Sequence, residues 1–238
     1  MARNRSSGRR GNGRRPEPVV RASQSRLESF GFTVRKQDPQ VDQRIEDTAT
    51  RMYYISKVPE NLLWEHGSLV SSLSEGPVTL LIVGELRQTH MTNPDGTPVA
   101  RVTVTLQPVD SFAVPAAHAL SIRYSQTLPD YTSGLSPVEL TIGTWSMADA
   151  CEKSGSQVIP FRAVYDARKI QSMDHTQMVR MRGTDLEPGD LVLAEVMVSQ
   201  SVLATDAIGR PENWIAVFDL TCVQLLMRGL GAQPDGSR

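Results

Sequence analysis

Residues 77–106, PVTLLIVGELRQTHMTNPDGTPVARVTVTL, carry the clearest structural signal in the chain. The run 77–87 is apolar and β-branched, which is typical of a buried strand. The run 99–106 alternates, with Ala100, Val102, Val104 and Leu106 on one side and Val99, Arg101, Thr103 and Thr105 on the other. Between them, Asn93-Pro94-Asp95-Gly96 is a turn, because proline presets φ and glycine tolerates a positive φ. The pattern predicts a β-hairpin over 77–106.

Short β-rich runs separated by Pro, Gly, Asp and Asn continue this texture on both sides of the hairpin. The further predicted strands are 52–57, 118–124, 138–145, 158–165, 178–182, 191–198 and 214–226. Short helices are predicted in 59–73, with Gly67 as a break, in 146–157 and in 167–173. Strands and helices do not alternate regularly, which argues against a parallel sheet. The predicted fold is therefore all-β, an antiparallel eight-stranded jelly-roll sandwich with one to three short helices.

The first sixteen residues, MARNRSSGRRGNGRRP, have a different composition from the rest. They hold six arginines among Gly, Ser and Asn, with no lysine, no acidic residue and no large aliphatic residue after Met1. Such a segment cannot bury enough apolar surface to offset the entropy of ordering, so we expect a disordered arm. Guanidinium groups pair bidentately with phosphate, which makes a polyanion the expected partner of this arm.

The net charge of −1 conceals an asymmetry between the arm and the body. Residues 1–21 carry +6 and the remaining residues carry −7. This distribution predicts a nucleic-acid or membrane-surface partner for the arm, and the absence of an apolar face disfavours the membrane. There is no apolar run long enough to span a membrane and no secretory signal. A transit peptide fits the composition of 1–15 but lacks the amphipathic stripe.

Four regions are predicted along the chain. Residues 1–21 are the disordered Arg-rich arm, 22–51 a polar linker, 52–228 the jelly-roll domain and 229–238 a flexible C-terminal tail. No internal repeat is visible.

Motifs of enzymes and cofactor sites are missing from the sequence. There is no P-loop, GxSxG, HExxH or EF-hand loop, and the four histidines stand at no metal-ligand spacing. Cys151 and Cys222 are interpreted as buried free thiols. We therefore expect no enzyme, no cofactor and no metal. The three tryptophans are expected to pack in the core or in an interface.

The acidic cluster at residues 184–190 has two possible interpretations. The segment TDLEPGD, 184–190, contains Asp185, Glu187 and Asp190, which together with Asp130 and Asp174 offer oxygen ligands for Ca²⁺. A solvated acidic turn is the favoured interpretation, because Glu-Pro-Gly-Asp is good turn chemistry by itself.

The arm ARNRSSGRRGNGRRP, a short linker and a β-rich body without catalytic motifs resemble the coat proteins of small icosahedral positive-strand RNA plant viruses. The kinds meant are bromoviruses, cucumoviruses, ourmiaviruses and sobemoviruses, and the arm is most similar to cucumovirus arms. The resemblance covers the layout of the whole chain. It implies a capsid protein that self-assembles into an icosahedral shell and packages single-stranded viral RNA by sequence-nonspecific phosphate contacts. The implied RNA contacts are Arg3, Arg5, Arg9, Arg10, Arg14, Arg15 and Arg21.

The same resemblance implies a place in the virion, and in the host cytoplasm during assembly. The arm equally suits a non-structural RNA-binding protein, such as a viral movement protein, a silencing suppressor or a cellular RNA chaperone. An enzyme with a basic localisation tail is the third hypothesis, which a pocket with convergent titratable groups would support.

Overall fold

A computed structural model describes residues 51–71, 76–127, 138–146, 158–172, 174–209 and 211–229. All of them belong to one unit, Gln43–Arg238. The predicted arm, nearly all of the linker and all but the first residue of the C-terminal tail lie outside the described residues, so those predictions remain predictions.

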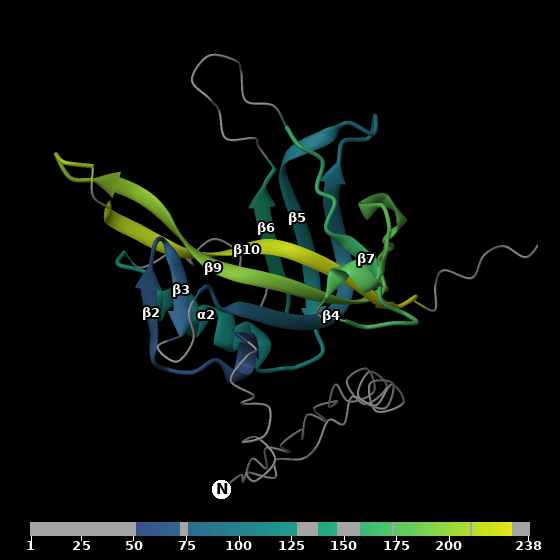
Figure 1. Cartoon of the computed structure of the whole chain (residues 1–238), viewed down its shortest axis with the longest axis horizontal. Helices are drawn as coiled ribbons and strands as arrows, with labels where there is room; N and C mark the ends of the chain where they lie inside the picture. Colours follow the sequence, from purple (N-terminus) through teal and green to yellow (C-terminus); the bar gives the residue numbers. More distant parts are fainter. Residues whose placement is uncertain are drawn as a thin grey trace, which may run out of the picture. The chain divides into compact units, whose positions relative to one another are not determined.

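The described residues are mostly β-strand, as predicted (Figure 1). The strands are β1 (Met52–Tyr54), β2 (Leu62–Glu65), β3 (Ser68–Ser71), β4 (Thr79–Thr92), β5 (Pro98–Pro108), β6 (Leu140–Trp145), β7 (Val164–Asp166), β8 (Val179–Arg180), β9 (Leu191–Thr205) and β10 (Pro211–Met227). The α-helix is α2 (Ala113–Tyr124), and three 3-10 turns are η2 (Ile55–Lys57), η3 (His175–Gln177) and η4 (Gly183–Asp185).

The five long strands close a ring of hydrogen-bonded pairs in the order β9-β4-β5-β6-β10 and back to β9. The β4–β5 hairpin confirms the prediction for 77–106. All neighbours in the ring are antiparallel except β6 and β10, which meet in parallel at Gly143 and Asp219. The remaining strands join this ring from outside: β1 on β4, the β2–β3 hairpin on β9, and β7–β8 on β10.

The strand count and the purely antiparallel sheet were predicted wrongly. The described residues form ten strands in one mixed network, with parallel pairs at β1–β4, β6–β10 and β7–β10. The jelly roll itself is not confirmed by these pairings. The physical reason is that β10 is long enough to pair with β9 on one edge and with both β6 and β7 on the other. Local patterning predicts a strand but not its partners.

The interior of the ring holds the main apolar core. The alternation predicted for β5 is confirmed, because Val102, Val104 and Leu106 are fully buried. Val99 differs from the prediction, since it is buried although Arg101, on the same predicted side, is exposed. The β4–β5 pairing shifts register between His90 and Thr92, close to the turn, and such a shift changes which face a side chain takes.

Helix α2 occupies residues where a strand was predicted at 118–124. Its buried residues recur at helical spacing: Ala113, Val114, Ala117, Leu120, Ser121 and Tyr124. Pro115 lies in the first turn, where the missing N–H costs nothing. The indole N–H groups of Trp64 and Trp214 each donate to the carbonyl of Tyr124 at 3.2 Å, which anchors the C-terminal end of the helix.

Residues 59–73 were predicted to be helical, but 62–71 form the β2–β3 hairpin. His66 and Gly67 both have positive φ angles, 49° and 79°. Two consecutive residues of this kind make the type I′ turn that suits a two-residue hairpin loop. The predicted helix at 167–173 is absent from the described residues 167–172.

Candidate nucleic-acid interface

The outward face of β5 and β6 carries an exposed tryptophan, Trp145. Because interior side chains alternate with exterior ones, three cross-strand pairs lie on this face. The pairs are Arg101 with Trp145, Thr103 with Gly143, and Thr105 with Thr141.

Trp145 ends β6 and leaves 65% of its surface exposed. The guanidinium carbon of Arg101 lies 5.8 Å from the centroid of the indole ring, within the range of a cation–π contact. Trp145 was predicted to pack in the core or in an interface, and its exposure shows that it is not a core residue. An exposed indole beside a cation is a flat platform on which another planar group can stack.

The other side chains of this face are small, and most of them are polar. The hydroxyls of Thr105 and Thr141 lie 2.9 Å apart, and Gly143 adds no side chain. Neither β5 nor β6 contains an Asp or a Glu. On the neighbouring strand β10, Asp219 stands beside Gly143, and its carboxylate accepts a hydrogen bond from the hydroxyl of Ser199. The two strands of this face therefore carry no carboxylate of their own, and Asp219 of β10 lies beside them.

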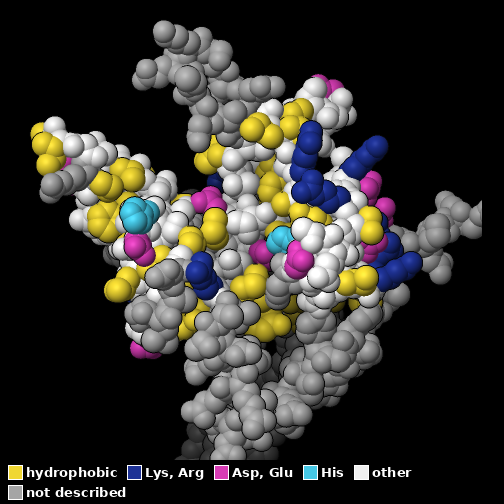
Figure 2. Space-filling model, in the orientation of Figure 1, with side chains coloured by type: hydrophobic (Ala, Val, Ile, Leu, Met, Phe, Trp, Pro, Cys, Tyr) yellow, Lys and Arg dark blue, Asp and Glu magenta, His cyan; other side chains and the backbone are white. Residues whose placement is uncertain are grey.

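Basic side chains gather in the segment around β7 and β8. The exposed ones there are Arg162, Arg168, Lys169, Arg180 and Arg182. Figure 2 shows Lys and Arg side chains on the side where β7 lies in Figure 1. Arg168 pairs with Asp166 at 2.6 Å, and this hydrogen bond lowers the pKa of Asp166 to about 2.

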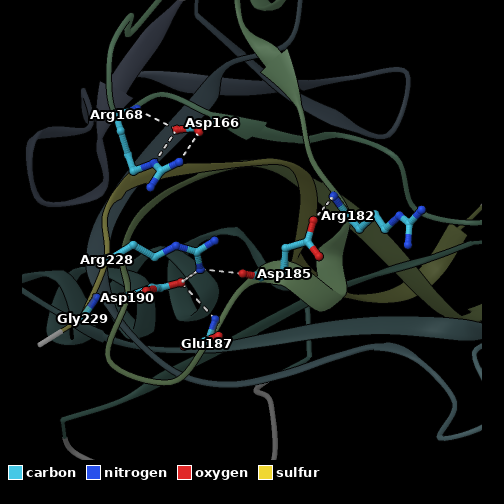
Figure 3. Close-up of polar contacts among 8 residues, drawn as sticks. All are labelled: Asp166, Arg168, Arg182, Asp185, Glu187, Asp190, Arg228 and Gly229. Carbon is cyan, nitrogen blue, oxygen red and sulfur yellow. Dashed lines mark hydrogen bonds and ion pairs between the residues drawn. The ribbon is translucent and has the colours of Figure 1, made fainter. Parts of the chain in front are cut away.

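The acidic segment 184–190 folds as a latch, a turn whose carboxylates are held by hydrogen bonds from the protein itself (Figure 3). Asp190 is fully buried and accepts from the Arg228 guanidinium at 2.8 Å and from the backbone N–H groups of Glu187 at 2.9 Å and Gly229 at 3.0 Å. These donors join the turn before β9 to the end of β10. The carboxylate that a cation would need is already satisfied by protein donors.

The other candidate calcium ligands are also used locally or lie elsewhere. Asp185 accepts from the backbone N–H of Arg182 at 3.1 Å and caps η4. Asp174 caps η3 by accepting from Thr176. Asp130 lies outside the described residues. The segment is a turn, as predicted, but it is not solvated throughout, because Asp190 is fully buried and bonded to protein donors.

The arginines predicted to contact RNA, Arg3, Arg5, Arg9, Arg10, Arg14, Arg15 and Arg21, all lie outside the described residues. So does Cys151. Cys222 is a buried free thiol, as interpreted from the sequence. Burial and the neighbouring carboxylate of Glu195 raise the pKa of this thiol. Arg101 and Trp145 were not predicted from the sequence to be binding residues. The alternation of 99–106 did place Arg101 on the side opposite the buried Val102 and Val104.

No protein-family model and no curated protein matches this sequence. Among solved structures, the chain is similar to gp2.5, a single-stranded DNA-binding protein encoded by bacteriophage T7. The sequence identity is 12% and the TM-score 0.36, over 67% of this chain and 92% of that chain. A TM-score of this size does not establish a shared fold. Within the described residues, no helix is long and apolar enough to cross a membrane.

Proposed function

We propose that this chain binds single-stranded nucleic acid, with RNA as the expected partner, on the outward face of β5 and β6. The observation that carries the proposal is the exposed indole of Trp145 with Arg101 beside it. Bases stack on such aromatic side chains whatever their sequence, and a neighbouring arginine adds a cation–π contribution. A face without carboxylates on its own two strands suits a polyanion.

The strand order of the ring supports the same location. A five-stranded barrel in which the first strand pairs with the second and fourth, and the third lies parallel to the fifth, has the arrangement of an OB-fold. In OB-folds the second and third strands bind oligonucleotides. Here β5 and β6 occupy these two positions in the ring. This support is an analogy of fold, whereas the chemistry of Trp145 stands by itself.

The arginine-rich arm is a second source of contacts with nucleic acid, separate from the face of β5 and β6. Its seven arginines are expected to provide phosphate contacts that carry no sequence information, so affinity is expected to fall steeply with salt. Stacking at Trp145 distinguishes a single strand from a duplex, because only unpaired bases expose their faces. The two parts together bind any single strand and prefer no sequence.

The test measures the binding of a fluorescent oligouridylate by anisotropy at one fixed salt concentration. Trp145→Ala is expected to weaken binding by about 1–3 kcal/mol, from about fivefold to about a hundredfold. Phe112→Ala is the matched control, because Phe112 is 71% exposed but belongs to the start of α2. Equal losses in the two variants, or none in Trp145→Ala, would sink the proposal.

The same assay with an oligodeoxythymidylate and with a duplex of equal length identifies the ligand. We expect RNA and DNA single strands to compete for one site, with the duplex bound more weakly. A duplex that binds as tightly as the single strand contradicts stacking on unpaired bases as the mode of recognition.

Shell assembly, as in a capsid protein of a virion assembled in the host cytoplasm, is the second function that we propose. The observation that favours it is the hairpin of β9 and β10, which extends beyond the ring in Figure 1. Its distal part exposes Val202, Leu203 and Ile208, and Figure 2 has hydrophobic side chains at the same end. Apolar side chains gathered at an exposed end are typical of a protein contact.

Electron microscopy of the purified protein with RNA separates the two functions. Uniform closed shells support a capsid protein. Ribonucleoprotein filaments or small soluble complexes support a non-structural RNA-binding protein, such as a movement protein or a silencing suppressor. A monomer at high concentration with RNA present excludes a shell.

A further inference from the structure

A cluster of metal-ligating side chains lies on the outer side of β9 and β10, away from the face of β5 and β6. Glu195 and Cys222 stand directly opposite each other, because a register shift between Leu220 and Cys222 restores their pairing. Both are buried. His175 of η3 reaches this pair from outside, and its Nε2 lies 2.8 Å from Oε1 of Glu195.

These three side chains bring three kinds of ligand atom together. The imidazole nitrogen of His175, a carboxylate oxygen of Glu195 and the thiol sulfur of Cys222 all lie within 4.8 Å of one another. They come from three segments that are distant in the sequence. Such convergence of nitrogen, oxygen and sulfur donors is the donor set that zinc accepts in proteins.

An independent observation comes from Gln224, which is fully buried and projects to the same side as Cys222. Its Nε2 donates to Oε1 of Glu195 at 2.5 Å. Its Oε1 is the one buried side-chain acceptor without a partner among the described residues. Native structures rarely leave such a group unsatisfied, and a cation beside Glu195 would be a partner for it.

We propose that His175, Glu195 and Cys222 bind one divalent transition-metal ion, with Zn²⁺ as the best match. The thiolate disfavours Mg²⁺ and Ca²⁺, which prefer oxygen ligands alone. Three protein ligands leave one tetrahedral position for water or for the amide oxygen of Gln224. On binding, the metal–sulfur bond replaces the S–H bond of Cys222, and the proton passes to solvent.

The surroundings provide an entry path and support for the histidine. The His175 side chain is 31% exposed and lines a pocket of about 290 Å³, together with Tyr165, Thr176, Met178 and Arg180. The ring of Tyr165 stacks on His175 with centroids 4.9 Å apart, which holds the imidazole in one orientation. The metal would clamp η3 to the ring and so act as a structural ion.

The experiment titrates Co²⁺, a spectroscopic substitute for Zn²⁺, into the reduced, metal-free full-length protein. We expect one equivalent to produce the visible bands of tetrahedral cobalt and a thiolate-to-cobalt charge-transfer band in the near ultraviolet. Excess Zn²⁺ should remove these bands and raise the thermal midpoint, as any ligand of the folded state does. The readout involves no nucleic acid, so its result is independent of the function proposed above.

Two variants and two matched controls assign the ligands. Cys222→Ser should abolish the charge-transfer band. His175→Ala should weaken Co²⁺ binding by at least about tenfold, because even the loss of a residue that only orients a metal ligand has an effect of about this size. Cys151→Ser and His66→Ala should leave the spectrum unchanged. His66 is an exposed histidine of the β2–β3 turn.

Three outcomes overturn the proposal. The first is a cobalt spectrum without the charge-transfer band. The second is a band that survives Cys222→Ser and disappears in Cys151→Ser. The third is a His175→Ala protein that binds Co²⁺ with unchanged affinity and is shown by circular dichroism to be folded. This outcome remains decisive if the variant of the buried Cys222 does not fold.

Discussion

At the scale of single residues, Asp190 is a fully buried carboxylate held by three protein donors (Figure 3). Asp190→Ala removes the acceptor of two backbone N–H groups and leaves the Arg228 guanidinium with the Asp185 carbonyl alone. We expect the free energy of unfolding to fall by about 3 kcal/mol, measured by urea denaturation followed by circular dichroism. Glu212→Ala, at an exposed position on β10, is the control and should change stability by less than about 0.5 kcal/mol. Similar losses in both variants would contradict the latch.

Asp166 gives a prediction about pH. The hydrogen bond from Arg168 lowers the folded-state pKa of Asp166 to about 2, below the ordinary value near 4. A depressed pKa contributes stability above the ordinary value, and this contribution is lost as the pH falls toward 2. Because both side chains are partly exposed, the contribution is expected to stay below about 1 kcal/mol.

Asp166→Asn should therefore lower the urea midpoint at pH 6, and the difference from the natural protein should vanish near pH 2. Glu212→Gln serves as the control, with no difference expected at either pH. A difference for Asp166→Asn that stays constant from pH 6 to pH 2 would show that the ionised carboxylate is not responsible.

Among the structural elements, the β2–β3 turn carries a local strain. His66 adopts a φ of 49°, which costs an ordinary side chain energy, whereas asparagine tolerates it. His66→Asn creates the Asn-Gly pair preferred in type I′ turns and should raise the free energy of unfolding by about 0.5 kcal/mol. Gly67→Ala should lower it by about 1 kcal/mol, because only backbone strain changes there. Calorimetry measures both, and a lower midpoint for His66→Asn would contradict this account of the turn.

The closure of the ring depends on Gly143, where β5, β6 and β10 meet. A Cβ atom at this position would lie 2.6 Å from the carbonyl oxygen of Val102 and 3.0 Å from Cγ2 of Thr103. Gly143→Val should therefore destabilise the protein by about 2–3 kcal/mol. Thr141→Val, on the same strand and the same face, should have little effect. If both variants melt at the temperature of the natural protein, β5 and β6 accommodate the added side chain, and the close packing at Gly143 does not stabilise the ring.

Some of the structural elements were predictable from local sequence patterns and others were not. The hairpin 77–106 was predicted because its turn and its alternation are both encoded within thirty residues. The β2–β3 hairpin was mistaken for a helix because its apolar residues fit either period, and only the backbone angles of His66 and Gly67 distinguish the two. Helix α2 was missed because its pattern begins at Ala113, before the run that was interpreted as a strand.

For the molecule as a whole, partners in space were not predictable from the sequence. The ring needs β10 to meet β6, and no local pattern specifies that pairing. The pairing of β5 with β6 brings Arg101 to Trp145, and a register shift brings Cys222 opposite Glu195. In both cases the residue types were visible and their proximity was not. The sequence therefore predicted strands and a polyanion-binding arm, whereas both candidate sites on the body required the fold.

The charge distribution of the whole chain provides the last prediction. Residues 1–21 carry +6 and the rest −7, so most phosphate contacts are expected from the arm. Replacing the six arginines of residues 1–16 by glutamine should make the slope of log affinity against log salt shallower by about 4, at about 0.7 per lost phosphate contact on a single strand. Trp145→Ala should shift that line downward and leave its slope unchanged, since stacking releases no counterions. Anisotropy titrations at four or more salt concentrations measure both slopes. If the arm variant keeps the natural slope, the phosphates are neutralised by the exposed arginines and lysine around β7 and β8 and not by the arm.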